Sequence, residues 1–170
     1  MAIERRYSAA EMDTLQTRSN LGVCLEKLGR IKEAVEVRRE VYDGYVRLAG
    51  EEHELALATA HNYASILVKL DGRHEEIKSL LRKAMPVARR VFGKNHNITL
   101  GMRWIYAQAV IVTPGATLED TREGVEMLED TTRTMRRVFG SAHPDVVNIE
   151  AVLGSARKAL ATHPDGPHPA

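Results

Sequence analysis

The chain has 170 residues, with 24 Lys and Arg against 23 Asp and Glu, and a net charge of +1. That length fits one domain or one array of repeats, and the near-neutral charge argues against attachment to nucleic acid or lipid by overall charge. The single cysteine, Cys24, excludes an internal disulfide and a thiolate zinc site. No run approaches the ~20 apolar residues of a membrane span, and the amino terminus lacks a signal peptide's apolar core, so we expect a cytoplasmic protein.

Apolar residues spaced by three and four positions predict helices along nearly the whole chain. The first helix is expected to start at a capping box, Ser8 to Glu11, and to end before a turn at Gly29. A second helix is predicted from Ile31 to Leu48. We expect the apolar residues of the first helix to form one buried face, with Cys24 as an inert thiol within it. That face consists of Leu15, Leu21, Cys24, Leu25 and Leu28.

The same alternation continues through the rest of the chain. Helices are predicted at 57–70, 74–92 and 97–112, and a longer loop then ends where Thr117 to Asp120 form a capping pattern that starts the next helix. Pro86 is expected to kink or break its helix, because proline removes one backbone donor. A last helix, from Pro144 to about Leu160, has the position of a first helix without a second, as expected of a cap.

A repeated motif divides the chain into units. Gly-x-x-His occurs at 50–53, 93–96 and 140–143, and the pentapeptide Arg-Arg-Val-Phe-Gly occurs at both 89–93 and 136–140. Repetition at this period predicts an all-α, right-handed solenoid of three helical hairpins with a C-terminal capping helix. The array is expected to span 13–160. Residues 1–12 are interpreted as a stub of a longer protein with the start of the first helix, and 161–170 as a disordered tail.

The units resemble the tetratricopeptide repeat. In the first unit Asn20-Leu21-Gly22, Gly29 and Glu33-Ala34 match its small residues and turn glycine, and the second unit keeps Asn62-Tyr63-Ala64 and Gly72. The unit length of about 42 residues and the motif His143-Pro144-Asp145 are similar to the kinesin light chain subclass. The sequence departs from the family pattern at Arg18, Ala60 and Arg103, where the family usually has a large aromatic residue.

The resemblance implies a concave groove, lined by the first helix of each unit, that binds a peptide. The residues that it places there are Asn20, Lys27, His61, Asn62, Lys69, Trp104 and Gln108. Lys27 and Lys69 hold equivalent positions, so an acidic peptide or a C-terminal carboxylate would suit them. The alternative is that both are solvated lysines beside turns and that the asparagines cap local structure. Trp104 is either a partly exposed anchor for the partner or packed against the neighbouring unit.

The sequence shows no pattern for catalysis, a metal or a cofactor. His53, His96 and His143 lie one repeat apart, too far to share an ion, and there is no glycine-rich phosphate loop. Arginine pairs at 38–39, 89–90 and 136–137 could form a phosphate-binding strip, but cations near helix carboxyl ends also suit the helix dipole. Glu36 and Glu40 are expected to neutralise the first pair.

Two classes of function follow from this reading. The favoured hypothesis is a non-catalytic scaffold or adaptor that needs no cofactor and binds a peptide segment of a partner protein in its concave groove. The alternative is a self-assembly unit that stacks through exposed solenoid ends, which would make the protein a weak homo-oligomer instead of a monomer. Neither hypothesis involves nucleic acid or a membrane.

Overall fold

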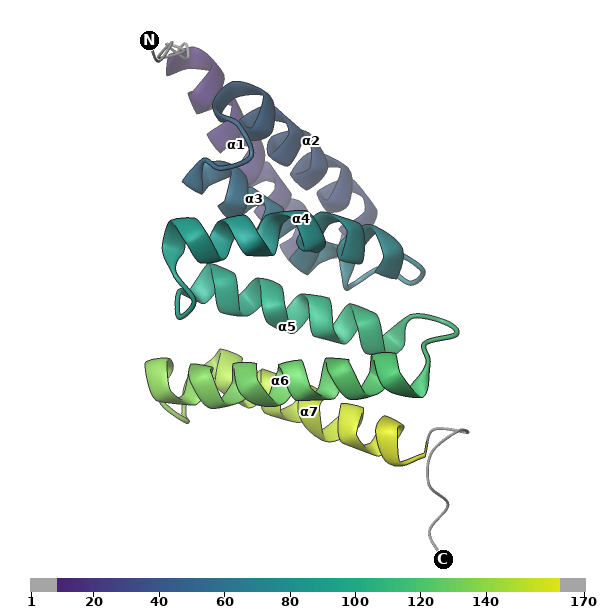
Figure 1. The fold of residues 1–170 in the computed structure, drawn as a ribbon. Coiled ribbons are helices and arrows are strands. Elements are labelled where there is room, and N and C mark those ends of the chain that lie inside the picture. Colours follow the sequence, from purple (N-terminus) through teal and green to yellow (C-terminus); the bar gives the residue numbers. More distant parts are fainter. Residues whose placement is uncertain (1–8, 163–170) are drawn as a thin grey trace, which may run out of the picture.

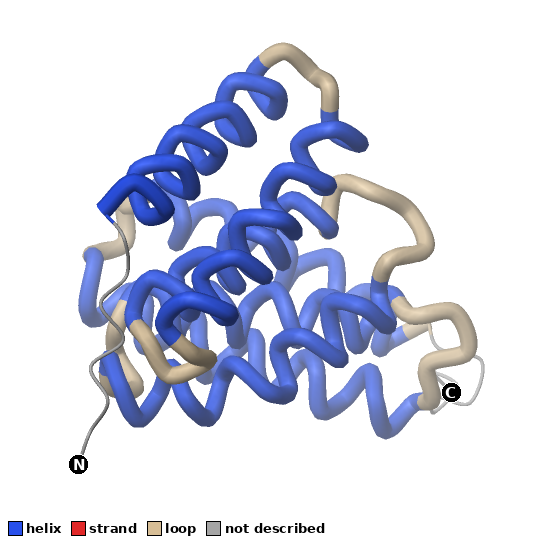
Figure 2. Tube along the Cα trace, turned by 90° about the horizontal axis from the view of Figure 1, so that it is seen from above, coloured by secondary structure: helices blue, strands red, loops and turns tan. Residues whose placement is uncertain are grey.

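The computed structural model describes residues 9–162, and no strand occurs among them (Figure 2). The helices of this range are α1 (Ala9–Lys27), α2 (Ile31–Ala49), α3 (Glu54–Leu67), α4 (His74–Phe92), α5 (Asn97–Val112), α6 (Leu118–Phe139) and α7 (Pro144–Ala161). The predicted all-α fold is confirmed. The expected Ser8 cap and the expected disorder of 163–170 fall outside the described residues.

Successive helices form hairpins that stack along the chain. Each helix packs against the next, so α1 and α7 lie at opposite ends of the array (Figure 1). The first helices of neighbouring units also meet, α3 against α5 and α5 against α7, but the backbones of α1 and α3 do not approach closely. In Figure 1 the α1–α2 hairpin runs obliquely to α4, α5 and α6, which are nearly parallel. The result is a solenoid in which the first unit joins the second through α2, while its first helix α1 does not approach α3.

Most helix bounds follow the prediction, and the exceptions have local causes. α3 begins and ends three residues earlier than expected, because the His53 side chain caps it and the chain turns after Leu67. α4 continues through Pro86, so the possible break does not occur. Pro86 is exposed, which leaves the carbonyl that its missing N–H would have bonded on the solvent side. Thr117 and Asp120 form the predicted capping box at the start of α6.

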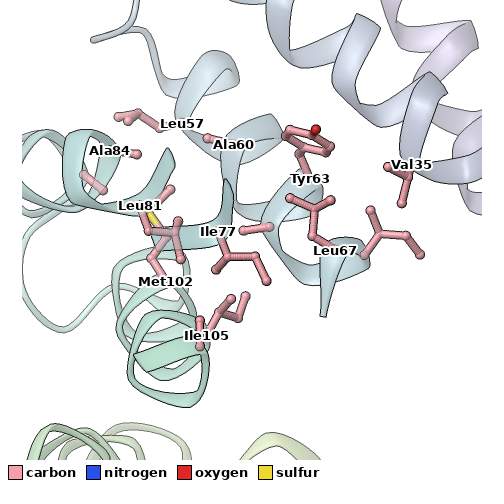
Figure 3. Close-up of a cluster of buried hydrophobic side chains, with 14 of the residues drawn as sticks. Val35, Leu57, Ala60, Tyr63, Leu67, Ile77, Leu81, Ala84, Met102 and Ile105 are labelled. Carbon is pink, nitrogen blue, oxygen red and sulfur yellow. The ribbon is translucent and has the colours of Figure 1, made fainter. Parts of the chain in front are cut away.

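The hydrophobic core is divided into clusters that each join neighbouring helices. In the central cluster Leu67, Ile77, Leu81 and Met102 are fully buried, and Figure 3 shows side chains from α3, α4 and α5 converging there. A second cluster joins α5, α6 and α7, and a smaller one around Leu15 joins α1, α2 and the start of α3. Stability in such an array comes from interfaces between neighbours, and the first unit contributes to two of these clusters, through Leu25, Ala34 and Val35 in the central one and through Leu15 in the smallest one.

The prediction of one buried face on α1 is wrong in part. Leu15 and Leu25 are buried against α2, as expected, but Leu21 is 48% exposed and Leu28 is 70% exposed. Cys24 is also exposed and is not an inert core thiol. The apolar residues of α1 lie on two sides of the helix. One side, with Leu15 and Leu25, packs against α2. The other side, with Leu21, Cys24 and Leu28, would be covered by a neighbouring helix inside an array, but it is exposed on α1.

Candidate peptide-binding groove

A groove of about 510 Å³ opens between α3, α5, the end of α6 and the start of α7. Its walls combine apolar side chains with amide, hydroxyl and imidazole groups. The lining residues are Ala58, His61, Asn62 and Ser65 of α3, Val68 and Lys69 of the turn after it, Asn97, Ile98, Gly101, Trp104, Ile105 and Gln108 of α5, Met135 and Phe139 of α6, and Asp145 of α7. A mixed surface of this kind suits a peptide, since apolar walls hold a side chain and polar groups meet the backbone.

Most of the residues predicted for the site meet in this groove. His61, Asn62, Lys69, Trp104 and Gln108 all line it. Asn20 and Lys27 do not, because they lie on α1, whose backbone does not approach α3. The groove is therefore formed by the second and third units and the capping helix, without the first unit.

The His61 ring of α3 lies against Gly101 of α5. A side-chain carbon added to Gly101 would lie 2.4 Å from Nε2 of His61, so only glycine leaves room for this ring on α5. Burial lowers the pKa of His61, and the nearby Arg38 charge lowers it further, while hydrogen bonding with Asn62 and the charge of Asp145 act in the opposite direction. His61 therefore favours the neutral imidazole, which can both donate and accept a hydrogen bond.

Lys69 is not a free cation. Its Nζ lies 2.7 Å from Oε1 of Glu26, and the other carboxylate oxygen of Glu26 accepts a hydrogen bond from Arg38. Burial raises the pKa of Glu26, but the hydrogen bond from Lys69 and the charge of Arg38 outweigh that effect and hold the pKa below its usual value. The expected pair of matched lysines is absent, because Glu26 takes up the charge of Lys69 and Lys27 lies outside the groove.

Arg38 has a different role from the one expected for the arginine pairs. One Nη donates to Glu26 and the other donates to the backbone carbonyl of Asn62 at 3.1 Å, so Arg38 connects α1, α2 and α3. Its side chain is 12% exposed. The expected neutralisation by Glu36 and Glu40 is wrong for this residue, because the Glu40 carboxylate accepts from Arg18 instead.

Trp104 shows features of both predicted alternatives. It is partly buried, lines the groove, and also packs against the cluster of α5, α6 and α7. Its indole nitrogen is buried without a hydrogen-bond partner among the described residues. Asn20 accepts a hydrogen bond from Gln16 at 3.4 Å, a local contact on exposed α1. Gln108 lies one turn beyond Trp104 on the same wall.

The three repeated histidines cap helices. Nδ1 of His53, His96 and His143 accepts a hydrogen bond from the backbone N–H two residues later, at 3.1, 3.3 and 3.2 Å. The rings of His96 and His143 lie against Phe92 and Phe139, the last residues of the preceding helices. Within residues 9–162, no group of three or more potential ligands is placed to hold a metal ion. These histidines set the start of each first helix.

Sequence reasoning missed the part of the groove outside the first helices of the units. Met135 and Phe139 come from the last turns of α6, and Asp145 comes from the first turn of α7. The motif His143-Pro144-Asp145 was a usable signal, because it places Asp145 at a helix start beside the previous unit. No comparable signal marks Met135, since the family positions for ligand contact exclude second helices.

Comparison with known families agrees with this architecture. The family model described as Tetratricopeptide repeat matches residues 13–89, from α1 into α4. No curated protein matches the chain. None of the helices within residues 9–162 is long and apolar enough to cross a membrane. Tetratricopeptide repeats generally mediate interactions between proteins. Residues 13–89 are thus similar to tetratricopeptide repeats, and α5, α6 and α7 continue the same stacking of helical hairpins.

Proposed function

We propose that the protein is a non-catalytic interaction module that binds an extended peptide segment of a partner protein in the groove of α3, α5 and α7. The observation that carries this proposal is the convergence of His61, Asn62, Trp104 and Gln108 on one hollow of about 510 Å³. An apolar side chain of the peptide lies against Trp104 and its neighbours, and the peptide backbone meets the amides of Asn62 and Gln108. The unit length further suggests the kinesin light chain-like subclass of the repeat.

The charge of the groove favours a limited acidic preference. Lys69 is half exposed but already paired with Glu26, and Asp145 adds a negative charge to the opposite part of the wall. An acidic group on the peptide must compete with Glu26 for Lys69, so its contribution to affinity is modest and falls with added salt. The apolar anchor and the backbone contacts supply most of the binding energy.

The proposal is tested by selecting random 12-residue peptides displayed on phage against the full chain. Because Trp104 is the single tryptophan, its fluorescence reports whether a selected peptide enters the groove. We expect bound peptides to shift that emission, and Asn62→Leu to weaken them about tenfold. Asn148→Leu, an exposed change on α7, is the matched control and leaves binding unchanged.

Two further outcomes decide between parts of the proposal. Lys69→Glu reduces the affinity of acidic peptides more than that of neutral ones, because Lys69 is the lysine that lines the groove. Lys27→Glu, which lies outside the groove, leaves both unchanged. Selected peptides that bind the Asn62→Leu variant normally and leave Trp104 emission unchanged would place the site elsewhere on the molecule.

A further inference from the structure

One side of α1 and of the turn after it carries a stripe of two leucines, a cysteine and two threonines that no described helix covers. It consists of residues at alternating steps of three and four, here called the outer stripe: Thr14, Thr17, Leu21, Cys24 and Leu28. All five are exposed, Leu21 by 48% and Leu28 by 70%. The side of α1 that holds Leu15 and Leu25 is a different one, and it packs against α2.

The equivalent positions of the later units are buried. Leu21 corresponds to Tyr63 in α3, which is 4% exposed and whose ring stacks on Tyr42 of the preceding helix α2. Cys24 corresponds to Ile66 in α3 and to Ala156 in α7, which are 0% and 4% exposed. In every later unit this side of the first helix is covered by the helix before it. The outer stripe therefore has the composition of an interface between helices.

The other end of the array is finished differently. The outward side of α7 carries Glu150 and Arg157 at the positions that Ala60 and Leu67 occupy in the interior of α3. Glu150 pairs with Arg136, and Arg157 pairs with Glu129, both at 2.6 Å. Ion pairs of this kind keep a surface in solvent. The C-terminal end thus has a polar face, and the N-terminal end does not.

We propose that the outer stripe binds the outer stripe of a second copy of the chain, with the two α1 helices antiparallel about a twofold axis near Leu21. Asp13, Asn20 and Lys27 lie seven residues apart along one edge of the stripe. An antiparallel pair brings Asp13 of each copy beside Lys27 of the other, and Asn20 beside Asn20. Neither Asp13 nor Lys27 has an ion-pair partner among the described residues. A parallel pair would put the two equivalent edges on opposite sides of the contact, so Asp13 would not meet Lys27.

The size of the contact sets the expected strength. α1 has 19 residues and is therefore about 28 Å long. A single helix pair of this length buries less than the roughly 1,600 Å² of a standard stable interface, so the dimer is weak, with a Kd of tens of micromolar. This association uses a surface separate from the peptide groove and does not depend on peptide binding.

Sedimentation equilibrium of the full chain from about 10 to about 500 µM tests the proposal. We expect a reversible monomer–dimer equilibrium that Leu21→Glu with Leu28→Glu abolishes. Both side chains are exposed, and circular dichroism checks that the fold is kept. The matched control is Val147→Glu on α7, which is 55% exposed and leaves the dimer intact.

A charge exchange tests the antiparallel arrangement itself. Asp13→Lys weakens the dimer about fivefold to tenfold, and adding Lys27→Asp to that variant restores it. A concentration-independent monomer up to about 500 µM overturns the proposal. So does a dimer that persists with Glu at positions 21 and 28, and failure of the charge exchange to restore association overturns the antiparallel pairing.

Discussion

The first two junctions between successive first helices, α1 with α3 and α3 with α5, are built in different ways. Between α3 and α5 the backbones approach closely, and the His61 ring lies on Gly101. Between α1 and α3 the equivalent positions hold Ser19 and Ala58, and the backbones stay apart. A polar network connects the helices there, because Glu26 of α1 meets Arg38 of α2 and Lys69 of the turn after α3.

The difference shows that one repeat pattern permits two kinds of attachment. A packed junction is stabilised by side chains that fill the space between its helices, so it is sensitive to changes in side-chain volume. A polar junction is stabilised by a few hydrogen bonds and ion pairs, so it is sensitive to the loss of one partner. Glycine at 101 with a large ring at 61 closes the second junction and forms a wall of the groove. The first junction lacks that combination, which leaves Asn20 and Lys27 outside the groove.

The largest effect is expected from Arg38→Met. This change removes the donors to Glu26 and to the carbonyl of Asn62 from a side chain that is 12% exposed. We expect a loss of about 2 kcal/mol in the free energy of unfolding, measured by urea denaturation. The matched control is Arg39→Met, since Arg39 is 57% exposed and lies 3.9 Å from Asp43. Equal losses for both variants would show that the network does not hold the first junction.

Hydrogen exchange compares the two junctions directly. α1 packs closely against α2 alone, whereas α5 packs against α3, α4, α6 and α7. End units of a helical array open more readily than internal ones, so amides of α1 should exchange at least about tenfold faster than those of α5. The comparison uses residues in the middle of each helix and dilute protein, so that neither fraying nor association contributes. Equal protection of the amides of α1 and α5 would contradict the prediction that α1 opens more readily than α5.

A smaller effect is expected from Gly101→Ala. The added carbon would lie 2.4 Å from Nε2 of His61, so the ring must move, and the cost of about 2 kcal/mol exceeds the gain of about 1 kcal/mol in helix propensity. Gly154→Ala is the control, because nothing lies within 4 Å of its added carbon, and it should stabilise the protein. In the His61→Ala background Gly101→Ala should stabilise as well. A stabilising Gly101→Ala in the unchanged protein would show that the ring does not limit this junction.

The repeat period was enough to predict the fold. Glycines at the turns and the apolar spacing give the order of the helices, and most helix ends other than those of α3 lie close to their predicted positions. Position within a repeat also identified His61, Asn62 and Trp104 as groove residues. Repeat position identified these residues because α3 and α5 pack against each other as the first helices of neighbouring units in a regular solenoid.

The failures come from the first unit and from ion pairs. Asn20 and Lys27 occupy the same repeat positions as Asn62 and Lys69, which predicts that they line the groove. They do not, because α1 does not approach α3. Glu26 and Lys69 were both placed on the concave face, yet a residue pattern does not show that two such charges neutralise each other. Likewise the spacing of Leu21 and Cys24 indicates an apolar side without showing whether a helix covers it.

The smallest predicted effect is a pH dependence that belongs to the second junction. Burial lowers the pKa of His61 in the folded protein, so the unfolded chain binds a proton at His61 more readily than the folded chain does. The stability that comes from neutral His61 is complete above the unfolded pKa of about 6.5. It decreases as the pH falls below that value and stops decreasing once the folded protein is also protonated.

The measurement must separate the effect of position 61 from that of the histidines that cap α3, α5 and α7. Urea denaturation of the wild type and of His61→Gln is therefore compared between about pH 5 and pH 8. The capping contributions are common to both proteins, so the difference between the two curves belongs to position 61. We expect this difference to favour the wild type less as the pH falls below about 6.5. A difference that is independent of pH would mean that the ring is hydrated in the folded protein, and the packed junction would then be looser than the contact with Gly101 indicates.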